Sequence, residues 1–245
     1  GFVKKGENSK TFVYRVHDKP DEQKINSLSN IIKKFGYSIN QTSPKNLSSS
    51  LNTLLKNVKG KSESNMIETL TIRSMSKAIY TTNNIGHYGL NFKYYSHFTS
   101  PIRRYPDLIV HRLLEKYLSG EKSVEKNKIE DICKYTSEKE KDAAMAERDS
   151  IKYMQTKFLQ DKVGGIFEGV ISGVTEWGIY VELEKNKCEG LVRISSIKGD
   201  FYIFDKNTYS IIGRSTKNKY QLGDTIKIKI KNTDLERKQI DFILV

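Results

Sequence analysis

The sequence changes character near Asp161, and this change constrains the fold more than any other feature. Beyond Gly164-Gly165, short runs alternate between apolar and polar residues, with turn-forming residues between them. The runs are Ile166–Val174, Ile179–Leu183, Glu189–Ile194, Thr225–Lys231 and Gln239–Val245. Several short strands at such spacing are typical of a small β-sandwich or barrel. We therefore expect two domains of different class, residues 1–160 and residues 161–245, and an α+β chain overall.

The first part is expected to be mostly helical, after a strand-like run at Thr11–Val16. Apolar residues at helical spacing and helix-start residues predict the helices. They fall over about 21–35, 44–58, from Ser62–Ser64 to Ile79, from Ser100 onward, and over 126–160. Ser100 suits an N-cap and Pro101 the first helical position, so Pro106 is expected to distort a turn inside that helix. Ser137 and Glu140 fit a capping box, which predicts that the last helix restarts there.

The charge points to an anionic partner. The chain has 42 Lys+Arg against 29 Asp+Glu, a net +13. Residues 1–160 hold +11 of this and residues 161–245 only +2, so the excess is localised. Nucleic acid is the first expectation for such a partner. A genome that favours lysine codons is the alternative explanation, and the uneven distribution weakens it.

Composition excludes other classes. Mean hydropathy is −0.58, and no run approaches the ~18 apolar residues of a membrane span. Two cysteines far apart, Cys133 and Cys188, can form neither a disulfide scaffold nor a zinc site of the CxxC kind. We therefore expect no membrane association and a reducing, cytoplasmic location.

The densest chemical feature is the segment His97-Phe98-Thr99-Ser100-Pro101-Ile102-Arg103-Arg104-Tyr105-Pro106-Asp107. A helix N-terminus attracts anions through its free N–H groups, and arginine adds planar hydrogen bonds suited to phosphate. Aromatic residues just upstream are able to stack on bases. From physics alone, an ordinary capped helix with solvated arginines explains the segment equally well.

This segment, with Gly86-His87-Tyr88-Gly89-Leu90 before it, resembles the signature of the ribonuclease II / ribonuclease R family, in the C-terminal part of its catalytic (RNB) domain. The segments Phe12–Asp18, Thr71–Met75 and Ala146–Asp149 are also similar to that family. Arg103-Arg104-Tyr105-Pro106-Asp107 and Tyr14-Arg15-Val16-His17-Asp18 favour its ribonuclease R branch. The resemblance covers nearly the whole chain.

The β-rich part resembles an S1 RNA-binding domain, a five-stranded OB-fold barrel. The resemblance places Trp177 and Tyr180 where the family often has base-stacking aromatics, and Arg193 where it often has histidine. Asp234, Arg237 and Lys238 match the last contact region. In an ideal strand, a spacing of three puts Trp177 and Tyr180 on opposite faces. A bulge near Gly178 is therefore needed if both are to face RNA; otherwise either one is a barrel-core aromatic.

The resemblance implies a hydrolytic, processive exoribonuclease that degrades RNA from its 3′ end to nucleoside 5′-monophosphates, using Mg²⁺ held by aspartates. It implies that Arg103 acts on the scissile phosphate, and that single-stranded RNA contacts a set of other side chains. These are His97, Ser100, Arg104, Trp177, Tyr180, Arg193, Arg237 and Lys238.

No comparable aspartate cluster occurs in this sequence. We therefore expect a C-terminal fragment of such an enzyme, with no metal site of its own, that binds RNA as a monomer without hydrolysing it. Asp142, Glu147 and Asp149 are better explained by ion pairs on a helix surface. The alternatives are a free-standing RNA-binding module, and a structural helical protein with an unrelated barrel.

Overall fold

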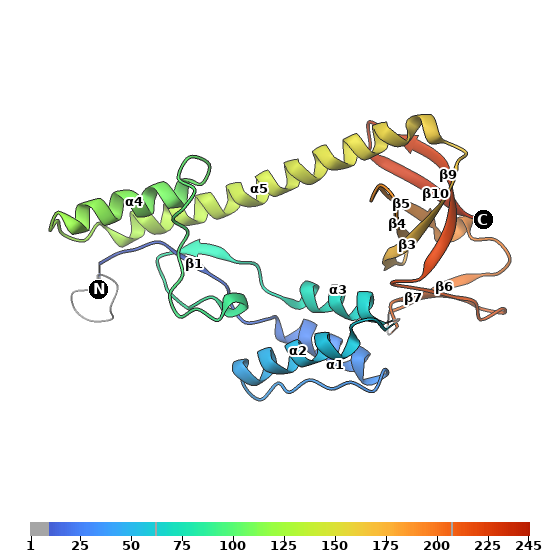
Figure 1. Ribbon diagram of the computed structural model, residues 1–245, viewed down its shortest axis with the longest axis horizontal. Helices are drawn as coiled ribbons and strands as arrows, with labels where there is room; N and C mark the ends of the chain where they lie inside the picture. The colour runs from blue at the N-terminus through green and yellow to red at the C-terminus, as the bar shows by residue number, and fades with distance from the viewer. Residues whose placement is uncertain (1–9, 62, 207) are drawn as a thin grey trace. The chain divides into compact units, whose positions relative to one another are not determined.

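The computed structural model describes residues 10–61, 63–206 and 208–245, coloured along the chain in Figure 1. These residues form two compact units. The first unit contains the described residues up to Asp21 and Met75–Met145, and the second contains Glu22–Ser74 and Ala146–Val245. Within the described ranges, every helix is too short or too polar to cross a membrane.

The first unit is built on a small antiparallel ladder. Strand β1 (Tyr14–Val16) pairs with β2 (Ile79–Thr81), and Arg15 lies opposite Tyr80. A short 3₁₀ turn, η1 (Tyr88–Leu90), follows in the chain. Helix α4 (Tyr105–Leu118) and the start of α5 (Lys126–Leu159) complete the unit. Its buried cluster comprises Phe12, Val13, Tyr14, Val16, Tyr80, Ile109, Val110, Leu113, Tyr117, Ile129 and Cys133. Burying one such side chain contributes about 1.5–3 kcal/mol.

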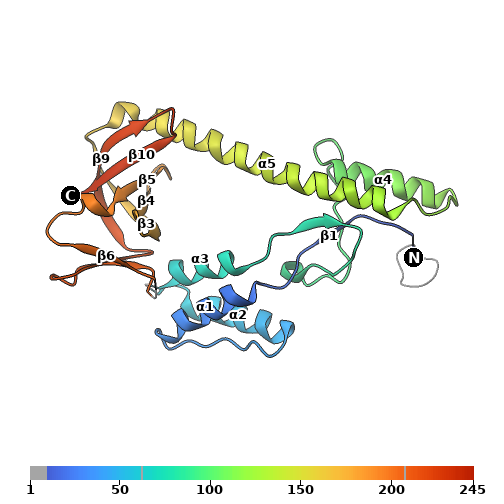
Figure 2. The same cartoon turned by 180° about the vertical axis from the view of Figure 1, so that it is seen from behind.

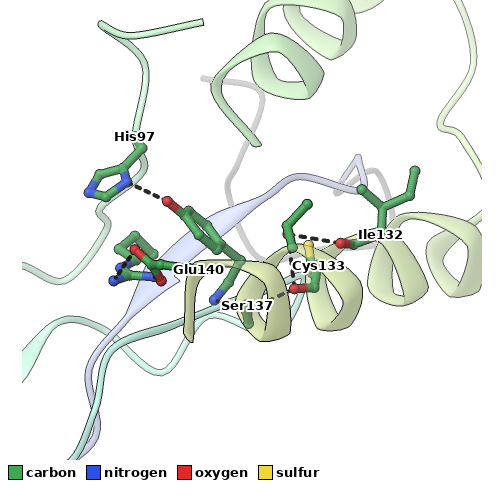
Figure 3. Close-up of polar contacts among 8 residues, drawn as sticks. His97, Ile132, Cys133, Ser137 and Glu140 are labelled. Carbon is green, nitrogen blue, oxygen red and sulfur yellow. Dashed lines mark hydrogen bonds and ion pairs between the residues drawn. The ribbon is translucent and has the colours of Figure 1, made fainter. Parts of the chain in front are cut away.

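Helix α5 is continuous, so the predicted restart at Ser137 is wrong. Ser137 is buried inside the helix rather than at a helix start. Its hydroxyl donates to the Cys133 carbonyl oxygen at 2.8 Å and accepts the Tyr80 backbone N–H at 3.0 Å, as Figure 3 shows. The hydroxyl therefore joins α5 to strand β2 instead of capping a new helix.

Three helices begin the second unit: α1 (Glu22–Lys33), α2 (Pro44–Val58) and α3 (Ser64–Ser74). Ser43 caps α2, because its side chain accepts the Asn46 N–H at 3.2 Å. The predicted third helix was too long at its end. It stops at Ser74, whose hydroxyl donates to the Thr71 carbonyl at 2.6 Å, and Ile79 lies in β2. Ser62, named as a possible start, lies outside the described residues.

The β-rich part contains a closed five-stranded barrel, ordered β10-β5-β4-β3-β9. Its strands are β3 (Ile166–Thr175), β4 (Gly178–Leu183), β5 (Glu189–Arg193), β9 (Thr225–Asp234) and β10 (Gln239–Leu244). The inward residues of β4 alternate along the strand, and Ile179, Val181 and Leu183 are buried. A 3₁₀ turn, η2 (Gln160–Lys162), links α5 to the barrel. The predicted combination of helices with a five-stranded barrel is confirmed.

Three further strands lie between β5 and β9 in the chain, and the sequence did not predict them (Figure 2). After a turn, η3 (Ile194–Ser196), strands β6 (Tyr202–Asp205), β7 (Ser210–Gly213) and β8 (Lys219–Gln221) form an antiparallel sheet of their own. Each strand has only three or four residues, which is too few for alternation to be recognised. We call residues 198–221 the insert.

The Asp200 carboxylate holds the insert's chain ends together. It accepts hydrogen bonds from the Thr216 hydroxyl at 2.7 Å and N–H at 2.6 Å, the Ser215 N–H at 2.9 Å, and the Phe201 N–H at 2.6 Å. Gly213 allows this approach, since a Cβ there would lie 2.6 Å from the carboxylate. The bonds from Thr216 above all lower the pKa of Asp200 to about 2.

The low pKa of Asp200 predicts how the stability of the chain depends on pH in acid. Asp200 stabilises the folded chain above its unfolded pKa of about 3.9, and that contribution is lost as the pH falls towards about 2. We expect a ¹³C NMR titration of the aspartate carboxyls to give Asp200 a midpoint near pH 2, with the Asp200→Asn spectrum identifying the signal. A midpoint near pH 4 would contradict the hydrogen-bonded arrangement.

Candidate nucleic-acid interface

The segment from Ser100 to Arg104 is a turn that leads into α4, not the first turn of the helix. The Ser100 carbonyl accepts the N–H groups of Arg103 at 3.3 Å and Arg104 at 3.0 Å. The helix begins at Tyr105 with Arg104 as its N-cap, so the predicted start at Ser100-Pro101 is wrong. Proline is tolerated in the first helical turn, where its missing N–H costs nothing. Starting at Tyr105 places Pro106 there, without the distortion that was expected.

Asp107 fixes the shape of this turn from inside the protein. Its side chain is fully buried. One carboxylate oxygen accepts the Ser100 N–H at 2.8 Å and an Arg104 guanidinium N–H at 2.9 Å. A hydrogen bond between Ser100 and Asp107, seven positions later, therefore closes the motif into a loop. The sequence pattern did not predict this role for Asp107, although an acid beside a proline in the first turn of a helix was an available signal.

The two arginines of the motif consequently differ. Arg104 is partly buried and paired with Asp107. Arg103 is exposed on the turn. Asp107 also places a negative charge in the first turn of α4, and Pro106 offers no N–H, so the helix terminus is a weaker anion site than expected. The group free to meet a phosphate is the Arg103 guanidinium.

His97 belongs to a polar cluster beside the turn, seen in Figure 3. Its Nδ1 lies 2.8 Å from the Tyr80 hydroxyl. Burial raises the pKa of Tyr80 to about 12, and burial followed by the charges of Arg104 and Arg15 lowers the pKa of His97. Both groups are therefore neutral at pH 7, and the tautomer of the His97 ring decides which of the two donates in this hydrogen bond.

Arg15 supports the same cluster. It makes a bidentate pair with Glu140, at 2.6 and 3.0 Å, and its guanidinium lies 4.5 Å from the centre of the Tyr80 ring. Glu140, predicted to close a capping box, therefore pairs with β1 instead. Nearby, Phe98 stacks on His111 with ring centres 4.2 Å apart, which leaves it half exposed.

On the barrel, Trp177 lies in the turn between β3 and β4 rather than in a strand. Its side chain is 67% exposed. Gly178 follows with φ of 150°, and a Cβ there would lie 2.1 Å from the Val192 carbonyl oxygen. Strand alternation would place residues three apart on opposite faces, but Trp177 precedes the strand. The turn therefore directs its side chain, and no bulge is needed for Trp177 and Tyr180 to face the same way.

Tyr180 points away from the barrel core, since its neighbours Ile179 and Val181 are the buried ones. It lies opposite Leu191 on β5, two pairs along the ladder from the Gly178–Arg193 pair. Arg193 is exposed and contacts Asp241 at 3.4 Å. Tyr180 and Lys238 line one pocket of about 110 Å³ together with Lys152 and Gln155 of α5. No sequence pattern pointed to these two α5 residues.

The remaining two predicted residues lie in the turn between β9 and β10. Arg237 is exposed and contacts Asp234 at 3.7 Å, a weak surface pair. Lys238 adopts φ of 54° and donates to Asp149 of α5 at 2.5 Å, which lowers the pKa of that carboxyl. Asp142 pairs with Lys139 on the helix surface at 2.8 Å, as expected, whereas Asp149 pairs with the barrel residue Lys238 instead of with a neighbour on its own helix.

The structure thus places the predicted residues in two groups. Ser100, Arg103, Arg104 and His97 lie in the first unit, and Trp177, Tyr180, Arg193, Arg237 and Lys238 lie on the barrel in the second. Within the described ranges, no three His, Cys, Asp or Glu side chains form a group able to hold a metal ion. The two groups consist mainly of arginine, lysine, histidine and aromatic side chains, which are not the carboxylate oxygen ligands that Mg²⁺ requires.

Comparison with known proteins gives two family models. The RNB domain model matches residues 4–120, and the S1 RNA binding domain model matches residues 160–244. The chain is 38% identical over 239 residues to Ribonuclease R of Aquifex aeolicus (strain VF5), covering 95% of this chain and 33% of that protein. The chain spans about a third of the length of the curated relatives it matches.

Solved structures agree. The apo form of Mycoplasma genitalium RNase R is similar with a TM-score of 0.83 and 30% identity, over 97% of this chain and 38% of that one. The same enzyme in complex with ribose methylated single-stranded RNA gives a TM-score of 0.84 and 31% identity, with the same shares covered.

The buried Asp107 makes a stability prediction. We expect Asp107→Ala to lower the free energy of unfolding by about 1.5–3 kcal/mol, because it leaves the Ser100 N–H and the Arg104 guanidinium without their acceptor. Urea denaturation measures this. Asp131→Ala, an exposed aspartate of α5, is the matched control and should change stability by less than about 0.5 kcal/mol. Equal effects would contradict the role of Asp107.

Proposed function

Because this chain belongs to the RNB family of ribonuclease R, we propose that it is the RNA-binding C-terminal part of a hydrolytic 3′-to-5′ exoribonuclease. Such an enzyme degrades RNA processively and releases nucleoside 5′-monophosphates. Residues 1–160 would be the end of the catalytic domain and residues 161–245 the S1 domain. The observation that carries the proposal is the exposed Arg103, held on a turn that the buried Asp107 closes.

We propose that Arg103 contacts the phosphate at which cleavage occurs. Its guanidinium offers two parallel N–H groups to phosphate oxygens and stabilises the charge that develops on them. Arg104 acts differently, since its pairing with Asp107 commits it to the turn. Ser100 contributes its backbone to the same turn. His97 presents its Nε2 to a hydrogen-bonding group of the RNA.

On the barrel, we propose that Trp177 and Tyr180 stack on bases while Arg193, Arg237 and Lys238 meet the phosphates. Trp177 is the strongest candidate, because most of its ring is exposed beside a backbone that Gly178 fixes. Arg193 and Lys238 each have a carboxylate partner already, so RNA competes with Asp241 and Asp149 for them. Single-stranded RNA is the expected ligand, because stacking requires unpaired bases.

We expect the chain alone to bind RNA as a monomer without cutting it, since its sequence carries no aspartate cluster for Mg²⁺. A cytoplasmic location suits its two thiols, Cys133 and Cys188, which are free and buried. Burial raises the pKa of Cys133 to about 12, so this thiol is unreactive.

Binding of a fluorescein-labelled 20-nucleotide oligo(A) tests the proposal. We expect anisotropy to give an affinity whose logarithm falls linearly with the logarithm of salt concentration. Trp177→Ala should weaken binding at least about fivefold, since stacking on one base contributes about 1–3 kcal/mol. Tyr135→Ala, an exposed aromatic of α5, is the matched control. The same mixtures with Mg²⁺ should release no 5′-monophosphate.

Two results would contradict the proposal. A wild-type chain without salt-dependent affinity for the oligonucleotide would favour a structural helical protein with an unrelated barrel. Clear release of 5′-monophosphates would mean that the chain hydrolyses RNA by itself.

Arg103 has its own test, in a complete enzyme that contains this segment. We expect Arg103→Lys to lower turnover far more than RNA affinity, because lysine keeps the charge but lacks the bidentate geometry. Single-turnover rates and dissociation constants separate the two effects. Arg112→Lys, an exposed arginine of α4, should change neither. An equal loss of turnover and affinity would make Arg103 a binding residue only.

A further inference from the structure

The insert has two faces of different character. On the inner face, Tyr202 and Ile211 are buried, and the rings of Tyr202 and Tyr220 lie 5.7 Å apart. Strands β7 and β8 lie beside β3 on the barrel. Because side chains alternate along a strand, the neighbouring residues point outward. The inner face therefore anchors the insert and leaves its other face to solvent.

The outer face combines apolar and basic side chains. Strand pairing sets Ile203, Ile212 and Lys219 in one row across the sheet. The next row contains Phe201 and Arg214, since the Arg214 N–H donates to the Phe201 carbonyl at 2.9 Å. Phe201 is 69% exposed and Ile203 49% exposed. We call these five residues the insert outer face.

The charge of this region is distinctive. Residues 198–221 carry five basic residues, Lys198, Lys206, Arg214, Lys217 and Lys219, against two aspartates, a net +3. Residues 161–245 as a whole carry +2, so the remainder of the β-rich part is −1. Asp200 is engaged in four hydrogen bonds, and Asp205 accepts one from the Thr208 hydroxyl at 2.6 Å. The positive excess of the β-rich part is therefore concentrated in the insert.

We propose that the insert outer face is a second contact surface for single-stranded RNA, separate from the Trp177 and Tyr180 residues of the barrel. Phe201 would stack on a base, and Arg214 and Lys219, with Lys217 of the adjoining β7–β8 turn, would meet the phosphates on either side. The inference rests on the proposed RNA-binding function and extends it. An anionic polymer with flat apolar bases is the occupant that matches exposed phenylalanine and isoleucine beside cations.

Continuity along the chain supports this assignment. Arg193 ends β5, and η3 follows it directly. The η3 turn lies beside both β4 and β6, so it joins the barrel's proposed contact residues to the insert. An RNA strand bound at Arg193 would thus be able to extend onto the insert outer face, which is basic and carries the exposed ring of Phe201.

The test compares two triple variants of the full chain in the oligo(A) anisotropy assay. Arg214→Gln/Lys217→Gln/Lys219→Gln removes three charges from the insert. We expect it to weaken binding about tenfold at low salt and to reduce the salt slope by up to about 2, since each phosphate contact on a single strand contributes about 0.7. Lys45→Gln/Lys56→Gln/Lys59→Gln removes three exposed charges on and just after α2 and should leave the slope unchanged.

A second variant separates stacking from charge. Phe201→Ala should weaken binding about fivefold with the wild-type salt slope, because a stacked ring releases no counterions. With 4-thiouridine in the oligonucleotide, photo-crosslinks should map to residues 201–214 as well as to Trp177.

The outcomes are distinguishable. If the wild-type chain binds RNA while the insert variants bind as the α2 control does, the insert proposal is overturned and the proposed function stands. If the wild-type chain does not bind the oligonucleotide, the proposed function fails first.

Discussion

The carboxylate of Asp107 is the interaction on which the arrangement of the first unit's basic motif depends. It is fully buried, and it holds a backbone N–H and a guanidinium that are seven and three residues before it. A buried charge is tolerated only when such partners surround it. The same contact commits Arg104 to the protein and leaves Arg103 on the surface. The different environments of Arg103 and Arg104 thus follow from one residue, Asp107, in the first turn of α4.

In the barrel, two different features of the backbone direct side chains outward. Its core needs only alternating apolar residues, and these determine which residues of β4 and β5 face outward. Presentation of Trp177 depends instead on the backbone of the turn before β4. The insert adds a net charge of +3, whereas the rest of the β-rich part carries −1. Exposed aromatic side chains therefore occur on both segments, whereas the net positive charge of the β-rich part comes from the insert.

The periodic elements could be predicted from sequence. Helix α2 matches its expected bounds, α5 matches within one residue, and all five barrel strands lie where alternation placed them. The errors have three different causes. Ser137 has the local pattern of a cap, yet its hydroxyl accepts an N–H from β2. Ser100 has the local pattern of a helix start, yet Pro106 and Asp107 move the start to Tyr105. The insert strands are too short for any period to be detected.

Gly178 illustrates how a residue without a side chain can govern a surface. A Cβ at this position would lie 2.1 Å from the Val192 carbonyl oxygen, so any replacement separates the backbones of β4 and β5 where Arg193 and Trp177 emerge. In a genetic screen for loss of ligand binding, Gly178 would then score with the contact residues although it has no side chain to contact a ligand. Mutational maps of this surface therefore need a measurement of strand pairing beside the measurement of binding. Without it, a position that only lets two strands pack closely would be counted as part of the interface.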